Sequence, residues 1–211
     1  MHRFILTIFS YFLFIAAQAQ YPGYKAVANT DAFKKSFAQS AQKTNTLKSD
    51  FVQEKTLSML SEKIVSKGKF YFKKENAIRM EYTSPFQYLM VINGNNVYIK
   101  DNQKENKMSA SSNKLFQSIN RIMMDCVKGT VFDNKDFSVK LYESNDAYLA
   151  ELTPLGKDLK KMFSKINMIS GKKDNLVKKV EMHEPSGDKT VLSYINPELN
   201  TTLSDALFNT H

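Results

Sequence analysis

The sequence is poor in the residues that build metal sites, disulfides and many catalytic centres. It contains one cysteine, three histidines and no tryptophan among 211 residues. A single cysteine excludes an intramolecular disulfide, and Cys126, His183 and His211 are too few ligands for a zinc site of cysteine and histidine. We therefore expect no metal and no cofactor. The fold must be held together by ordinary packing of apolar side chains.

Catalytic motifs are absent as well. The chain has no GxSxG, P-loop or GxGxxG pattern. His183 follows Val180 and Met182 in a strand pattern, which indicates an exposed strand histidine and not a catalytic base. Asp133 and Asp136 flank a polar loop and are expected to be solvated. We predict that the protein is not an enzyme, and we assign no catalytic residue.

The sequence also lacks an apolar run long enough to cross a bilayer. The longest run, from Phe4 to Ala17, follows a positively charged start and precedes the small-x-small site Ala17-Gln18-Ala19. It is shorter than the ~20 residues of a membrane-spanning helix. This pattern predicts a signal peptide over residues 1–19, cleaved after Ala19. We expect export to the periplasm and one domain over residues 20–211.

Acidic residues are outnumbered, which leaves a formal net charge of +9. Lysine pairs carry most of the excess. Two interpretations stay open at this point: solubility with protection of strand edges, or weak attraction to anionic lipid head groups or acidic partners. Because the chain is exported and has no recognition motif, we expect no nucleic-acid partner. We also expect a monomer.

What the sequence does contain is a dense β pattern between Asp50 and Asp101. Large apolar residues there alternate with polar ones, as in half-buried strands. Turn residues interrupt the pattern at Lys74–Asn76, Thr83–Pro85 and Asn93–Gly94. Such short links make the strands antiparallel neighbours. We expect the first strand over residues 47–56. Residues 58–66 then fit either a loop with a second strand or a helical turn, and we expect strand, loop and strand.

The fold class we predict is mainly β (α+β), with one curved antiparallel sheet from about Leu47 to Phe208. Its roughly ten strands should curl into an incomplete β-barrel, and the polar run 102–106 should end the first meander. Two helices are predicted, over residues 31–43 and 112–124, on the concave side. The second has a stripe of apolar residues at helical spacing and is the expected lid, with a hinge near Gly129. The lid residues are Leu115, Phe116, Ile119, Ile122 and Met123.

A series of local features points to a family. They are Phe51-Val52-Gln53, the glycine that opens the strand Gly68–Phe72, the segment Arg79–Pro85, and Asn93-Gly94 before Val97-Tyr98-Ile99. Their order resembles the periplasmic outer-membrane lipoprotein carrier family LolA, with its LolA/LolB-like fold. The family usually has a basic residue followed by proline after the Gly68 strand. Lys74 matches the basic residue, a possible lid latch, but Glu75 replaces the proline.

The resemblance implies a hydrophobic cavity for the acyl chains of lipoproteins, formed by the concave side of the sheet and the lid. The ten methionines alone favour a filled core, whereas the resemblance favours a lining that adapts to its ligand. The ligand-binding residues we predict face the concave side: Phe51, Phe70, Phe72, Ile78, Met80, Tyr82, Met90, Ile92, Val97 and Ile99.

The function implied is a periplasmic chaperone that carries acylated lipoproteins from the inner to the outer membrane. The implied partners are these lipoproteins, an inner-membrane lipoprotein-releasing complex and an outer-membrane acceptor. The alternative is a LolA-like envelope module that binds or senses lipid without shuttling lipoproteins. The sequence leaves the identity of the cargo and the resting position of the lid open.

Overall fold

The computed structural model describes residues 21–210 except positions 61, 75, 102–103 and 110–113, and gives only the backbone of residues 114–120. The predicted signal peptide lies outside the described residues. Every described strand belongs to one antiparallel sheet, in the order β1-β8-β9-β10-β11-β12-β2-β3-β4-β5-β6-β7. The sheet contains β1 Lys25–Ala26, β2 Thr46–Thr56, β3 Lys63–Lys73, β4 Ala77–Ser84, β5 Tyr88–Asn93, β6 Asn96–Asp101, β7 Glu105–Ser109, β8 Phe137–Glu143, β9 Ala147–Pro154, β10 Lys165–Gly171, β11 Val177–His183 and β12 Lys189–Leu199.

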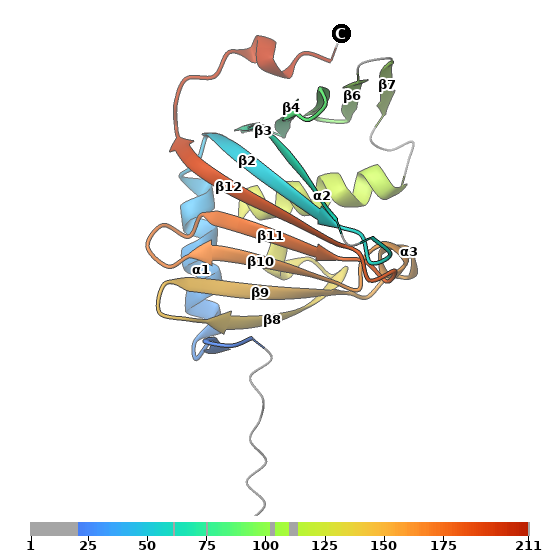
Figure 1. The fold of residues 1–211 in the computed structure, drawn as a ribbon. Helices are drawn as coiled ribbons and strands as arrows, with labels where there is room; N and C mark the ends of the chain where they lie inside the picture. The colour runs from blue at the N-terminus through green and yellow to red at the C-terminus, as the bar shows by residue number, and fades with distance from the viewer. Residues whose placement is uncertain (1–20, 61, 75, 102–103, 110–113, 211) are drawn as a thin grey trace, which may run out of the picture.

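The sheet is strongly curved and does not close. In the view that shows β8–β12 lengthwise, β4, β6 and β7 appear foreshortened (Figure 1), so the sheet turns between these two groups. Strands β1 and β7 stand at the two ends of the strand order. The mainly β class and the curved antiparallel sheet are confirmed, with twelve strands where about ten are expected.

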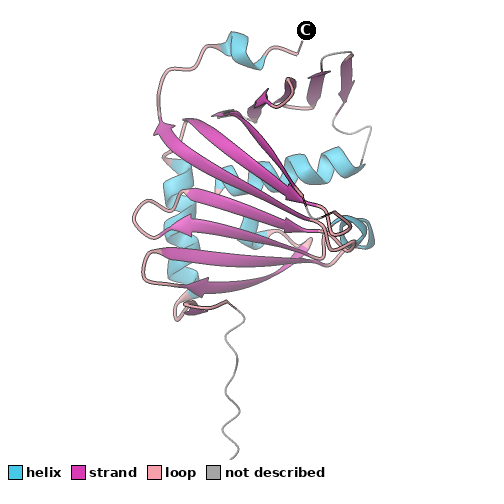
Figure 2. Ribbon diagram, viewed as in Figure 1, coloured by secondary structure: helices cyan, strands magenta, loops and turns pink. Residues whose placement is uncertain are grey.

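Two long helices lie on the same side of the sheet (Figure 2). They are α1, Thr30–Gln42, and α2, Lys114–Lys128, and α2 continues four residues beyond the predicted end at Met124. Helix α1 begins where Asn29 accepts a hydrogen bond from the Ala32 amide at 2.9 Å. A short helix, α3 Lys157–Met162, adds to the two predicted helices. The described residues also include two 3-10 turns, η2 Val131–Asp133 and η3 Asp205–Phe208.

The expected end of the meander at residues 102–106 is wrong, because β7 adds one more strand to β6. Val97 pairs with Met108 on the concave side. On this sheet edge Lys100 and Glu105 form an ion pair with Nζ and Oε1 2.5 Å apart. The charged side chains that suggest a loop therefore belong to an edge strand, where lysine and glutamate are common. The expected strand, loop and strand over residues 47–66 are confirmed as β2, a turn and β3.

Strands β2 and β12 join the two parts of the sheet. They come from opposite ends of the chain, and they pair Phe51 with Tyr194 and Gln53 with Leu192. Inward-facing residues continue from β12 into β2 and β3 because the register keeps the alternation in phase. The joined strands thus form one continuous concave surface.

The concave surface carries two hydrophobic clusters. The first lies under α1 and joins Phe33 and Phe37 to inward residues of β8–β10. The second lies under the C-terminal part of α2 and joins Met124 to inward residues of β2–β6 and β12. On the opposite face, Phe208 of η3 is buried against Ala77 and Val91.

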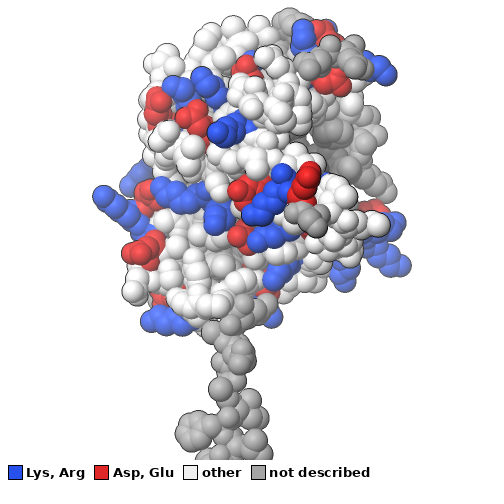
Figure 3. Space-filling view, viewed as in Figure 1, with Lys and Arg blue, Asp and Glu red and all other residues white. Residues whose placement is uncertain are grey.

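The outer face carries lysines and arginines interspersed with acidic residues (Figure 3). Many of the lysines have carboxylate neighbours, such as Lys48 Nζ at 3.0 Å from Glu198 Oε1 and Lys63 Nζ at 3.6 Å from Glu54 Oε2. Exposed pairs of this kind contribute little to stability. This mixture of signs favours the solubility interpretation of the lysines on the face in view.

Candidate functional site

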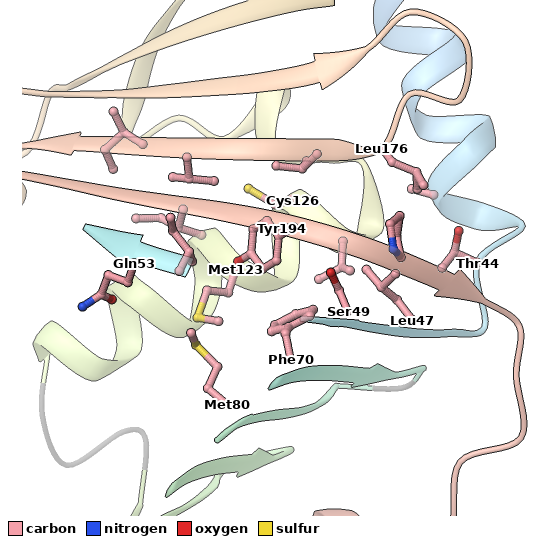
Figure 4. A pocket seen from close by; sticks show the side chains of 18 of the residues that line it. Thr44, Leu47, Ser49, Gln53, Phe70, Met80, Met123, Cys126, Leu176 and Tyr194 are labelled. Carbon is pink, nitrogen blue, oxygen red and sulfur yellow. The ribbon is translucent and has the colours of Figure 1, made fainter. Parts of the chain in front are cut away.

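A cavity of about 370 Å³ lies between the concave face of the sheet, α1 and α2. Its volume is within the range of small-molecule binding sites. Figure 4 shows Phe70, Met80, Met123 and Tyr194 pointing toward one another across it. The lining residues are Phe37, Ser40, Ala41, Thr44, Leu47, Ser49, Gln53, Phe70, Met80, Tyr82, Tyr88, Met90, Ile122, Met123, Cys126, Val127, Phe163, Ile166, Asn175, Leu176, Val177, Val180, Met182, Leu192, Tyr194 and Pro197.

Strand alternation positions most of the lining. In each strand the inward residues recur every second position, as for Met80 and Tyr82 in β4 or Leu192 and Tyr194 in β12. One glycine makes room for this arrangement. A Cβ on Gly68 would lie 2.6 Å from Cζ of Phe51 and 2.2 Å from the carbonyl oxygen of Glu81. Gly68 therefore allows the ring of Phe51 to pass across β3.

The ten predicted ligand-binding residues share the concave side, but they are not equivalent. All belong to the cluster under α2 or pack against it. Those that line the cavity are Phe70, Met80, Tyr82 and Met90. The others lie outside this lining, and most are fully buried: Phe51, Phe72, Ile78, Ile92, Val97 and the partly buried Ile99. Ligand binding by the ten residues stays a prediction.

The predicted lid is only partly described. Ile122 and Met123 line the cavity from α2. The side chains of Leu115, Phe116 and Ile119 lie outside the described residues, although their backbone is helical. The same helix contributes Cys126 and Val127 to the lining. The periodicity of the apolar stripe therefore identifies the side of α2 that faces the sheet.

The sequence does not predict several of the residues that line the cavity. Strands β11 and β12 supply Val180, Met182, Leu192 and Tyr194, and α1 supplies Phe37. The alternation of apolar residues in β11 and β12 predicts strands, but no local sequence feature indicates that β12 pairs with β2. Without that pairing, the second half of the lining cannot be assigned.

Most polar groups in the lining are already engaged within the protein. Thr44 Oγ1 donates to the Ser40 carbonyl at 3.1 Å, and Ser49 Oγ donates to the Ile195 carbonyl at 2.8 Å. The Tyr82 hydroxyl donates to Gln53 Oε1 at 2.9 Å. Burial raises the pKa of Tyr82 to about 12, so this phenol is neutral at physiological pH. The cavity thus offers ligands a largely apolar wall.

Cys126 behaves as an apolar residue of this wall. Burial raises the pKa of its thiol to about 12, so almost no thiolate is present at neutral pH. The sulfur lies 3.6 Å from the Met168 sulfur, and the residue keeps part of its surface toward the cavity. This setting is that of a small hydrophobic residue and not that of a reactive thiol.

Lys74 contacts the end of α1. Its Nζ donates to the Gln42 carbonyl at 3.0 Å, and its backbone amide donates to the Asn45 carbonyl at 2.8 Å. A positive charge stabilises the C-terminus of a helix because the last carbonyls are unpaired. Lys74 also borders a smaller cavity of about 290 Å³ with Val127 of α2. A latch between Lys74 and α2 stays a prediction.

The C-terminal end of α2 is fixed by several contacts. Asp125 accepts hydrogen bonds from the side chains of Thr130 at 3.1 Å and Asn134 at 2.6 Å. Gly129 is buried, and a Cβ there would lie 2.7 Å from Cα of Ala38 in α1. Gly129, the residue after α2, therefore lies very close to α1, and hinge motion near it stays a prediction. Its φ of +76° suits glycine, and the small side chain allows this approach.

The described residues contain no group of three or more histidine, cysteine, aspartate or glutamate side chains placed to hold a metal ion. No helix in the described part of the chain is long and apolar enough to cross a membrane. His183 is half-buried, where an exposed position is expected, and its Nε2 lies 3.8 Å from Glu181 Oε2. Burial lowers the pKa of this imidazole. The chemistry that the cavity supports is binding of apolar chains.

Comparisons with known proteins agree with this geometry. The family model described as outer membrane lipoprotein carrier protein LolA matches residues 42–211. No curated protein matches the chain significantly. A solved structure of an uncharacterized conserved protein from Thermus thermophilus is 10% identical with a TM-score of 0.51, over 85% of this chain and 93% of that chain. This likeness shows a shared fold.

Two further solved structures carry related descriptions. A LolA superfamily protein from Nitrosomonas europaea is 13% identical with a TM-score of 0.45, over 83% of this chain and 97% of its own. A putative outer membrane lipoprotein-sorting protein domain from Vibrio parahaemolyticus is 11% identical with a TM-score of 0.43, over 82% of this chain and 95% of its own.

Proposed function

Because the chain belongs to the LolA family of outer membrane lipoprotein carrier proteins, we propose that its cavity binds the acyl chains of lipoproteins and carries them from the inner to the outer membrane. Proteins of this family are periplasmic and generally not enzymes. The predicted signal peptide over residues 1–19 supports the same compartment. Residues 20–211 would then form one carrier domain.

The observation that carries this proposal is the cavity itself. It measures about 370 Å³, and aliphatic and aromatic side chains dominate its lining. Each methylene moved from water into such a site is stabilised by ~0.8 kcal/mol. Acyl chains therefore gain enough to be shielded while the lipoprotein crosses an aqueous compartment. No covalent step is needed.

Transfer also requires release, and we assign α2 the role of a lid. Met123 and Ile122 cover the cavity from α2. When the lid is open, acyl chains replace these side chains against the sheet, so the open and closed states differ modestly in free energy. Amide hydrogen exchange in α2 should be faster than in β3 and should slow when acyl ligand is added. Exchange in α2 as slow as in β3 and unchanged by ligand would contradict a movable lid.

The partners follow from the proposed route. An inner-membrane lipoprotein-releasing complex would load the carrier, and an outer-membrane acceptor would unload it. Loading of one lipoprotein needs only one copy of the cavity, so we propose a monomer. The latch role of Lys74 belongs to the same proposal, with α1 as the helix it contacts.

Native mass spectrometry of the protein purified from its own periplasm tests the proposal. We expect a population carrying a triacylated lipoprotein. The matched sample is the Met80→Lys variant, which places a charge in the lining and should lose that population while it stays folded. Only free lipid bound to the wild type would favour the alternative of a lipid-binding or sensor module that does not shuttle.

A further inference from the structure

Tyr194 places a hydroxyl group in the wall of the apolar cavity. The residue lies on β12, opposite Phe51 of β2, and its ring packs edge-on against Phe70 with 5.3 Å between ring centroids. These neighbours fix the ring in one orientation. Figure 4 shows the side chain of Tyr194 between Cys126 and Met123, in the middle of the lining.

The Tyr194 hydroxyl, like that of Tyr88, differs from the other hydroxyls of the described lining, which are bonded within the protein. Thr44, Ser49 and Tyr82 each donate to an oxygen of the protein. Within the described part of the chain, no hydrogen bond is found for the Tyr194 hydroxyl, and it is not sealed from the cavity. Burial is the main cause that raises its pKa, followed by the proximity of Cys126 and Tyr82. The phenol is therefore a neutral donor in an apolar setting.

A donor that faces an apolar cavity and has no acceptor from the protein favours a ligand that brings an acceptor. Hydrocarbon chains have none. The acyl chains of a lipoprotein or a phospholipid, however, begin at ester carbonyls on a glyceryl group. A carbonyl oxygen is the acceptor that a phenol in this setting would bind.

We propose that the Tyr194 hydroxyl donates a hydrogen bond to an ester carbonyl of a diacylglyceryl group, so that the cavity recognises acyl esters and not merely apolar chains. This inference rests on the proposed function and names the ligand atom. It makes Tyr194 a specificity-determining residue. One such bond in a water-poor site should change the affinity about fivefold.

The test compares ester and ether ligands. The affinities of 1,2-dioctanoylglycerol and 1,2-di-O-octylglycerol, which lacks the carbonyls, are measured by displacement of a fluorescent fatty acid. The wild type should prefer the ester about fivefold. Tyr194→Phe should remove this preference by weakening ester binding while ether binding is unchanged. Tyr71→Phe, which removes a hydroxyl outside the cavity lining, should keep the preference.

Several outcomes would overturn the inference. Tyr194→Phe could weaken both ligands equally, which would assign the ring a packing role, or change neither. A wild type that binds ester and ether equally contradicts the inference but leaves the acyl carrier intact. A wild type that binds neither ligand contradicts the proposed function as well.

A second measurement does not depend on the folding of a variant. The infrared band of a ¹³C-labelled ester carbonyl in dioctanoylglycerol should move to lower frequency on binding to the wild type, relative to the same ester in hydrocarbon. An unshifted band would overturn the inference. A synthetic S-diacylglyceryl cysteine peptide and phosphatidylglycerol, each labelled in the same way, distinguish the two sources of the ester.

Discussion

The concave face of the sheet is packed differently under its two long helices. Under α1, aromatic rings fill the space, and Phe33, Phe37 and Phe132 lie with ring centroids 4.9–6.0 Å apart. Toward the C-terminal part of α2, the sheet and the helices leave a cavity of about 370 Å³, which α1 borders through Phe37. There α2 presents Ile122 and Met123 to the hollow. Rigid aromatic rings fill the space under α1, whereas flexible aliphatic side chains border the cavity under α2.

The difference shows how one small core serves two purposes. Close-packed rings hold α1 in a single position, because any shift would open voids between them. Methionine is unbranched and polarisable, so its side chain follows the shape of a ligand. The half under α1 therefore provides stability, and the half under α2 provides a volume that a ligand completes. Four pairs of variants test this division, from the largest expected effect to the smallest.

A charge buried behind the cavity should have the largest effect. Ile78 has 0% of its surface exposed and lines neither cavity, whereas Met80 borders the larger one. Ile78→Lys should lower the free energy of unfolding by about 5 kcal/mol, because the ammonium group has no water and no partner. Met80→Lys should lower it far less and abolish binding of dioctanoylglycerol. Urea titration and ligand displacement measure both. If both variants lose the same free energy of unfolding, Met80 is a core residue and not part of a binding surface.

Truncation of a ring under α1 comes next. Phe33 is 4% exposed and contacts Phe132 and Tyr148 at ring-centroid distances of 5.2 and 4.2 Å. Phe33→Ala should lower the free energy of unfolding by about 4 kcal/mol and leave ligand affinity unchanged. Met123→Ala only enlarges an existing hollow and should cost roughly 1 kcal/mol while it weakens binding. The division fails if the two variants change stability equally.

The third pair of variants tests the close approach of Gly129 to α1, and we expect an intermediate loss of stability. Gly129 and Gly94 both have positive φ, at +76° and +58°, but only Gly129 has atoms of another segment near its missing Cβ. Gly129→Ala should lower the free energy of unfolding by about 2 kcal/mol, and Gly94→Ala by about 1 kcal/mol. Both variants share the strain of a positive φ, so the difference between their urea unfolding midpoints measures the effect of the contact with Ala38. If both variants lose the same free energy of unfolding, α1 moves away from the added methyl group without a loss of stability.

The smallest effect is expected for the end of α1. Lys74→Met removes the hydrogen bond to the Gln42 carbonyl and should lower the free energy of unfolding by about 0.5–1 kcal/mol. Lys69→Met removes the same charge from an exposed site on β3 and should change it by less than about 0.5 kcal/mol. Thermal unfolding of both variants is measured at low and high salt, because salt screens the interaction of the Lys74 charge with the helix end. If Lys74 also latches α2, its loss should speed amide exchange there.

Local pattern predicted much of the fold, because the signals of strands and helices lie within a few residues. Alternation in β3 and β4 indicated that Phe70 and Met80 face one side, and helical spacing indicated the stripe of α2. Strand β7 was missed, because Glu105–Ser109 is polar apart from Met108 and looks like a loop.

The candidate site was less predictable, because it depends on contacts between distant segments. The pairing of β12 with β2 brings Tyr194 and Leu192 into the lining, and no local signal indicates that pairing. The separation of Met80, which borders the cavity, from Ile78, which is fully buried, depends on where α2 leaves space. Alternation assigns both residues to the same face and cannot distinguish them.

The seam between β2 and β12 also determines when a binding site exists during biogenesis. Strand β2 is synthesised long before its partner β12, because the two strands lie far apart in the sequence. Such sequence-distant pairing is slow, because a long loop must close before any contact compensates for its lost entropy. A chain that stops before β12 has neither Leu192 nor Tyr194. Under the proposed function, the carrier therefore cannot accept cargo until β12 has been synthesised and has paired with β2.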